Sequence, residues 1–138
     1  MATKEEKAEY ARRWRERHPE RSRESRQAWK ENNPAQYLFH KARSRARQRG
    51  LEFDLTVEWV RERLDRGQCE VSRLPFDYDL GTFTKANPWS PTIDRRDSAL
   101  GYTMGNCRLV VWAYNAAKNT WGDEVVLELA EALTEVVE

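Results

Sequence analysis

The stretch that decides the fold is Thr92–Lys118, TIDRRDSALGYTMGNCRLVVWAYNAAK. It opens with an apolar segment that ends in a carboxylate, Asp94, and continues through a turn that contains glycine. A second apolar segment, 109–111, follows and leads into a helical segment that carries Asn115. The order strand, loop, strand, helix can bring one carboxylate and one amide oxygen to a single hard cation.

With Asp94, Asn106 and Asn115 at these positions, the stretch resembles the HNH or His-Me finger (ββα-metal) nuclease superfamily, most closely its phage endonuclease VII-like branch. The resemblance covers roughly residues 69–122. It implies phosphodiester cleavage with one divalent ion, Mg²⁺ or a substitute, held by Asp94 and Asn115. It gives Asn106 a structural role, bonding backbone in the loop between the strands. It also implies a phage or prophage setting, a DNA substrate that is branched or nicked, and a homodimer, for which the N-terminal arm is the candidate surface.

One position departs from the family, which has a catalytic His directly after the Asp, where this chain has Arg95. A guanidinium group cannot act as a general base near neutral pH. In the first interpretation, a metal-dependent DNA endonuclease or nickase, Arg95 grips the scissile phosphate and Asp97 activates water. This makes Asp94, Arg95, Asp97 and Asn115 the candidate catalytic residues. Lys118, one turn after Asn115, is then expected to reach a phosphate.

Two other interpretations of Arg95 stay open. In one, the finger is catalytically degenerate and binds nucleic acid without cutting it. In the other, Arg95 forms a structural ion pair with Asp94 or Asp97, and no metal binds. Asp77 and Asp79 are weaker candidates for a second metal ligand.

Relatives of the endonuclease VII type often carry a structural zinc on two CxxC pairs. The matching positions here are Cys69, Ser72, Val111 and Tyr114. Only one thiolate is left, and the other three side chains are poor or impossible zinc ligands. The sequence therefore predicts no structural zinc, with Cys69 and Cys107 as reduced, buried thiols.

The net charge of +1 conceals a split between the two parts of the chain. Residues 1–50 hold 15 Lys/Arg against 7 Asp/Glu, which is +8, and residues 51–138 hold 9 against 16, which is -7. A basic arm with interleaved aromatic residues indicates a polyanionic partner such as DNA. The basic residues expected to contact nucleic acid are Arg12, Arg13, Arg15, Arg43, Arg45, Arg47, Arg49 and Lys118.

The same aromatic residues leave another class of function open. In this class the arm docks a partner helix or a second subunit, and the protein is an interaction module. Binding that fails to weaken steeply with salt favours this alternative over nucleic acid.

The predicted fold is α+β: a small ββα-metal finger with flanking helices and an extended basic N-terminal helical arm. The predicted parts are a basic arm at 1–50, a finger domain at 51–122, and an acidic amphipathic helix at 123–138 that packs on the core. Periodicity, caps and breakers predict helices at 4–17, 20–32, 35–49 and 57–66, a short strand at 51–55, and a strand that runs into a turn over 69–76. No apolar run approaches the ~20 residues that span a bilayer, so we expect a cytoplasmic protein of a bacterial host.

Overall fold

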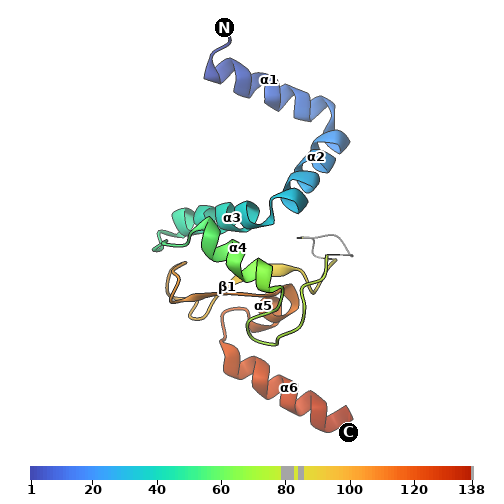
Figure 1. Cartoon of the computed structure of the whole chain (residues 1–138), viewed down its shortest axis with the longest axis vertical. Coiled ribbons are helices and arrows are strands. Elements are labelled where there is room, and N and C mark those ends of the chain that lie inside the picture. The colour runs from blue at the N-terminus through green and yellow to red at the C-terminus, as the bar shows by residue number, and fades with distance from the viewer. Residues whose placement is uncertain (79–82, 84–85, 138) are drawn as a thin grey trace. The chain divides into compact units, whose positions relative to one another are not determined.

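The computed structural model describes residues 1–78, 83 and 86–137. Within these residues the chain has six helices and one two-stranded antiparallel sheet, which makes it an α+β protein (Figure 1). The chain separates into two compact units, Met1–Asn33 and Pro34–Glu138. In the described part of the chain, no helix has both the length and the apolar character that crossing a bilayer demands.

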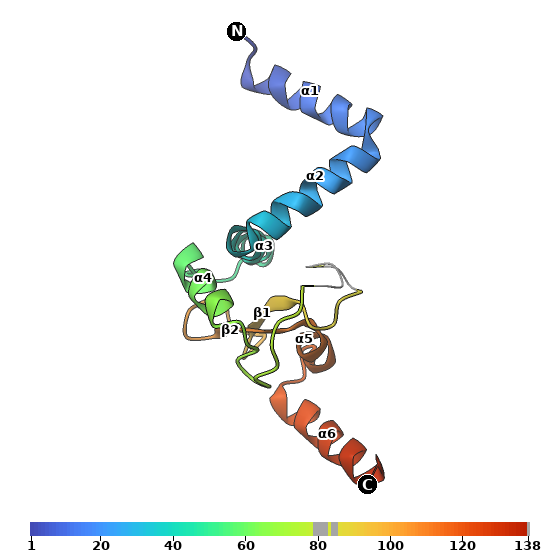
Figure 2. The same cartoon turned by 45° about the vertical axis from the view of Figure 1, so that its right-hand side comes forward.

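The first unit consists of helices α1 (Lys4–Arg17) and α2 (Pro19–Asn32), which confirms both predicted helices. A capping box starts α1: Thr3 Oγ1 accepts from the Glu6 amide at 3.1 Å, and the Glu6 carboxylate accepts from the Thr3 amide at 2.7 Å. The break falls before Pro19, since proline cannot donate the backbone hydrogen bond that would continue α1. The two helices meet there at an angle (Figure 2).

The second unit begins with α3 (Pro34–Arg49). Leu38, Ala42 and Ala46 recur every four residues along α3 and form a buried stripe, which packs on α4 (Val57–Arg66) and on the sheet. The predicted arm of residues 1–50 therefore divides at Asn33, because the small side chains of α3 let it dock closely on the core.

Helix α4 has the predicted boundaries and caps. Thr56 Oγ1 accepts from the Trp59 amide at 3.0 Å, and Gly67 ends the helix in the left-handed region with a φ of 72°. Trp59 and Val60 are buried on the face that meets the sheet.

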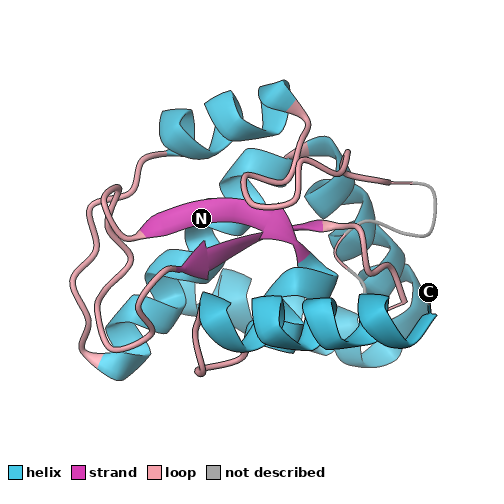
Figure 3. Cartoon of the chain, turned by 90° about the horizontal axis from the view of Figure 1, so that it is seen from below, coloured by secondary structure: helices cyan, strands magenta, loops and turns pink. Residues whose placement is uncertain are grey.

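The sheet pairs β1 (Pro91–Arg95) with β2 (Cys107–Val111), which lie side by side in Figure 3. Every residue of β2 is buried, and four of the five residues of β1 are. Helix α5 (Trp112–Lys118) follows β2 directly and packs against both strands. The order strand, loop, strand, helix is therefore present at the stretch that predicted it.

Two predicted strands do not form. The segment 51–55 makes a single parallel bridge, Phe53 with Tyr102, because the partner segment turns away after Thr103. In the segment 69–76 the predicted turn is present, and the predicted strand is reduced to one bridge between Gln68 and Pro75. Proline has no amide hydrogen to extend that pairing.

The last helix, α6 (Asp123–Val137), was expected to pack its apolar face on the core. It contacts α5 near its start, but none of its described residues is buried. Leu129 and Leu133 are 54% and 56% exposed. The predicted amphipathic pattern is present, and the core does not cover it.

Candidate functional site

A pocket of about 320 Å³ opens beside the end of β1 and the face of α5. Asp94 and Asn115 both line it, as the resemblance implies. Three guanidinium-bearing side chains join them, Arg95 from β1 and Arg45 and Arg49 from α3. The pocket therefore gathers one carboxylate, two amides and several cationic groups.

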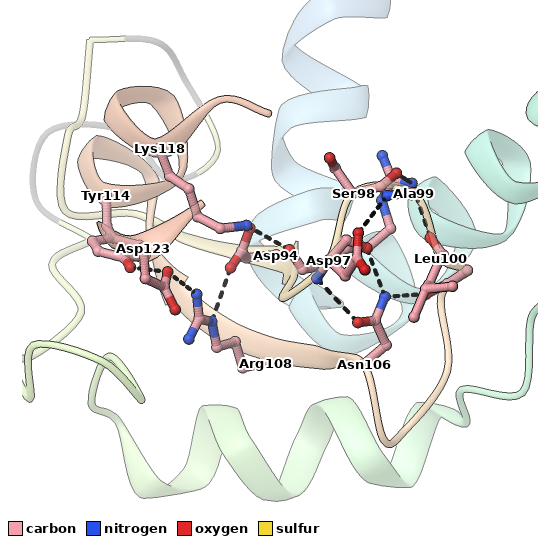
Figure 4. A network of polar contacts seen from close by, with 12 residues as sticks. Asp94, Asp97, Ser98, Ala99, Leu100, Asn106, Arg108, Tyr114, Lys118 and Asp123 are labelled. Carbon is pink, nitrogen blue, oxygen red and sulfur yellow. Dashed lines mark hydrogen bonds and ion pairs between the residues drawn. The ribbon is translucent and has the colours of Figure 1, made fainter. Parts of the chain in front are cut away.

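Asp94 is buried, with 3% of its surface exposed, and both of its oxygens are bonded (Figure 4). Lys118 Nζ donates to Oδ1 at 3.0 Å, and Arg108 Nε donates to Oδ2 at 2.9 Å. Lys118 also donates to the carbonyl oxygen of Arg95 at 2.5 Å. Two cationic side chains therefore neutralise the buried carboxylate.

The network continues outward through Arg108, which donates to Asp123 Oδ1 at 2.6 Å. The Tyr114 hydroxyl donates to the same oxygen. The bond from Arg108 lowers the pKa of the Asp123 carboxyl, while burial and the bond to Asp123 raise the pKa of Tyr114 to about 12. Burial lowers the pKa of Arg108, but its bonds to Asp123 and Asp94 outweigh burial, so the pKa is raised overall.

The residues present do not fit the divalent ion that the resemblance implies. Each oxygen of Asp94 already faces a cationic group, and a second positive charge at that position would be repelled. Asn115 adds only one amide oxygen. Among residues 1–78, 83 and 86–137, no three His, Cys, Asp or Glu side chains gather as a metal-binding group. Asp79 lies outside the described residues.

Lys118 takes a place that differs from the expected one. It is 1% exposed and bound to Asp94, whereas the resemblance implies contact with a phosphate. The Lys118 side chain points inward from α5 because the buried carboxylate of Asp94, near the end of β1, accepts its hydrogen bond. Arg108 was not among the predicted site residues. No local signal marks Arg108, because its role depends on the antiparallel register that places it opposite Asp94.

Arg95 has a bracing role in the loop that follows β1. Its Nη1 donates to the carbonyl oxygens of Ser98 at 2.6 Å and Leu100 at 3.1 Å. Its guanidinium carbon lies 5.0 Å from the ring centre of Tyr102. The ion pairs found for Asp94 are with Lys118 and Arg108, so Asp94 does not provide the structural ion pair expected of Arg95.

Asp97 and Asn106 organise the same loop (Figure 4). The Asn106 amide accepts from the Asp97 backbone at 3.1 Å and donates to the carbonyls of Asp97 at 3.0 Å and Gly101 at 2.9 Å. These are backbone bonds of the kind expected of Asn106. The Asp97 carboxylate accepts from the Ala99 amide at 2.9 Å and does not line the pocket. Asp97 is thus a turn residue in this structure, in contrast to the expected water-activating base.

The predicted nucleic-acid-binding arginines fall in different settings. On α3, Arg45 and Arg49 line the pocket, Arg47 is exposed, and Arg43 lies over the Phe39 ring at 5.2 Å. On α1 of the first unit, the remaining three are exposed. Arg12 and Arg13 pair with Glu9, and Arg15 borders a shallow groove together with Trp14.

Of the four positions that match the zinc ligands of relatives, Cys69 and Val111 belong to the hydrophobic core, Tyr114 packs against it and Ser72 is exposed. Cys69 and Val111 are buried, and the Ser72 amide donates to Cys69 Sγ at 3.5 Å. Cys107 is also buried, and burial together with Asp94 raises its pKa to about 12. The burial predicted for both thiols is confirmed, and the absence of zinc stays a prediction.

Comparison of the chain with protein-family models, with curated proteins and with solved structures gave no match. Function is therefore inferred from the pocket and its charges.

Proposed function

We propose that this protein binds nucleic acid through the phosphate backbone, at the pocket lined by α3, β1 and α5, and that it does not cut the strand. The observation that carries the proposal is the charge balance of the pocket. Arg45, Arg49 and Arg95 line it, and Asp94, the one carboxylate among its lining residues, is already neutralised by Lys118 and Arg108.

Neutralisation of Asp94 matters because an unpaired carboxylate in the wall of the pocket would repel a phosphate bound there. With Lys118 and Arg108 bound to it, the pocket presents the surplus charge of its arginines. Guanidinium groups suit phosphate, since their planar forks donate two parallel hydrogen bonds. The half-buried Trp112 also lines the pocket and is of the residue type on which bases stack.

The order β1, β2, α5 supports the assignment of this region to the ββα-metal finger type. On this proposal, the finger retains the order of its elements, and Lys118 and Arg108 occupy the oxygens of Asp94 that would bind the metal in the family. The exposed arginines of α1, which belong to the first unit, form a second basic surface suited to a phosphate backbone.

Fluorescence anisotropy with duplex and branched DNA tests the proposal over a series of salt concentrations. Affinity should fall steeply with salt, and the double variant Arg45→Ala/Arg49→Ala should flatten the logarithmic slope by about 2. Arg61→Ala is the matched control, because Arg61 is exposed on α4 and does not line the pocket. Binding that ignores salt, or that Arg61→Ala weakens equally, would refute the pocket as the binding site.

A second candidate is metal-dependent DNA cleavage or nicking, with Asp94, Arg95 and Asn115 in its centre. The specific observation in its favour is that these three residues line one pocket. Nicking of supercoiled plasmid with Mg²⁺, Mn²⁺ or EDTA separates the two candidates. Cleavage that needs metal and is lost in both Asp94→Ala and Asn115→Ala would replace the non-cleaving proposal.

A further inference from the structure

Helix α6 carries an apolar face that the described core leaves uncovered. Leu129 and Leu133 are more than half exposed, and Val136 and Val137 are 84% and 86% exposed. In Figure 1, α6 extends from the end of α5 away from the sheet. An apolar face of this extent on a charged protein indicates an interaction surface.

The face has the spacing of a coiled-coil seam. Val126, Leu129, Leu133 and Val136 recur at the alternating three- and four-residue intervals of the two central heptad positions. The positions that flank this seam are small or apolar, and the sequence places there Val125, Ala130, Ala132 and Val137. The seam is therefore wide and uncharged along both edges, apart from the first residue of the helix.

The acidic residues of α6 lie on its opposite side. At 100° per residue, Glu124, Glu128, Glu131 and Glu135 all fall on the outer heptad positions, away from the seam. They keep that side in water, and they cannot reach across the seam to a partner. The face therefore selects a partner by apolar shape and without help from charge.

We propose that the α6 seam binds the α6 seam of a second copy of this chain. Two such helices can pair without like-charge contact, because the acids of both point outward. Alanine at three-residue spacing from the seam leucines lets the helices approach closely. A second copy of the chain supplies an identical apolar face. Helices α1 to α3 offer no such face, because they carry mainly charged and polar side chains.

Other occupants fit this face less well. Nucleic acid is repelled, since α6 carries five acids and no base between residues 123 and 137. A basic helix would gain specificity only from acids at the edges of the seam, and those positions are apolar. The pairing surface is also distinct from the arm, through which the sequence predicts a homodimer.

The helix has 15 residues, or about two heptads, so the dimer should be weak and dependent on protein concentration. A dimer would carry two of the proposed phosphate pockets, and linked sites raise the apparent affinity for a long polyanion. The pairing itself does not rest on the proposed function, because it can be measured without nucleic acid.

Sedimentation equilibrium of the full chain over a concentration series tests the proposal. Leu133→Gln removes a leucine from the centre of the seam and should raise the dimer dissociation constant about thirtyfold, since two copies lose it. Leu127→Gln is the matched control. Leu127 is 59% exposed against 56% for Leu133, but it lies on the acidic side of α6. Glutamine forms helix well, so neither change unfolds α6, and circular dichroism verifies this.

The supporting result is a concentration-dependent dimer that Leu133→Gln weakens and Leu127→Gln leaves unchanged. A wild-type protein that stays monomeric up to the highest soluble concentration would overturn the proposal. A dimer that survives the double variant Leu129→Gln/Leu133→Gln would overturn it too, and would direct attention to the arm. Equal loss in the Leu127→Gln control would show that the seam is not the contact.

Discussion

Replacing Lys118 by methionine is the sharpest test of the idea that a side-chain cation holds the buried carboxylate. Methionine keeps most of the buried stem and removes the ammonium group. Lys118 is 1% exposed, and its nitrogen donates to Asp94 Oδ1 at 3.0 Å and to the Arg95 carbonyl at 2.5 Å. The variant therefore leaves a carboxylate with one cation in place of two, and a carbonyl that has lost a donor.

The size of the effect follows from these contacts. Removing one partner of a buried ion pair costs about 3–5 kcal/mol. Arg108 stays bound to Asp94 at 2.9 Å, so we expect a loss at the lower end, about 3 kcal/mol. For the unit Pro34–Glu138, that loss corresponds to a fall in Tm of roughly 14 °C.

The assay is urea unfolding followed by circular dichroism, with Lys7→Met as the control at an exposed lysine of α1. The double variant Asp94→Asn/Lys118→Met should recover about 2 kcal/mol relative to the sum of the single changes, because no unpaired charge remains. A loss below 1 kcal/mol in Lys118→Met, or strict additivity of the two changes, would refute the ion-pair reasoning.

Three further predictions test the loop, the outer network and the cation site. Gly101→Ala should cost about 1–3 kcal/mol by urea unfolding, because the new methyl would lie 2.5 Å from the Glu52 carbonyl; Gly105→Ala, with open space around it, should change little, and equal losses would contradict the close approach. The pKa of Tyr114 is raised from 10.0 to about 12 in the folded state, so its contribution to stability is complete below pH 10 and is lost as the pH rises through about 12. In thermal melts, Tyr114→Phe should reduce this loss of stability at high pH, and a pH profile equal to that of the wild type would contradict the prediction. Saturating Mg²⁺ should leave the wild-type Tm unchanged in thermal melts without nucleic acid, whereas a clear rise would mean that the ion does find ligands.

The elements that can be predicted from the sequence are those with local signals. Pro19 and the caps at Thr56 and Gly67 define their helices, since each acts on backbone within a turn of itself. The segment 51–55 looks like a strand by alternation, but a strand needs a partner. Only Tyr102 pairs with it, and alternation cannot reveal how long a partner segment stays alongside.

The candidate site was predictable in position more than in chemistry. The order strand, loop, strand, helix predicted that Asp94 and Asn115 come together, and both line one pocket. It could not show that Lys118 turns inward, because the direction of a long side chain depends on burial around it. For the same reason, Arg108 looks like an ordinary strand residue until its partner across the sheet is known.

The pairing of Asp94 with Arg108 also bears on how the chain finds its fold. The two strands are joined by an eleven-residue connection, 96–106, which is too long to set their alignment as a tight turn would. Both strands are buried on either side, so burial alone discriminates poorly between neighbouring alignments. In the native alignment Asp94 lies opposite Arg108. A shift by one residue would place Asp94 opposite Cys107 or Leu109 and Arg108 opposite Ile93 or Arg95, so neither charge would face a partner of opposite sign. The ion pair between Asp94 and Arg108 thus favours the native register of the two strands and disfavours misaligned hairpins during folding.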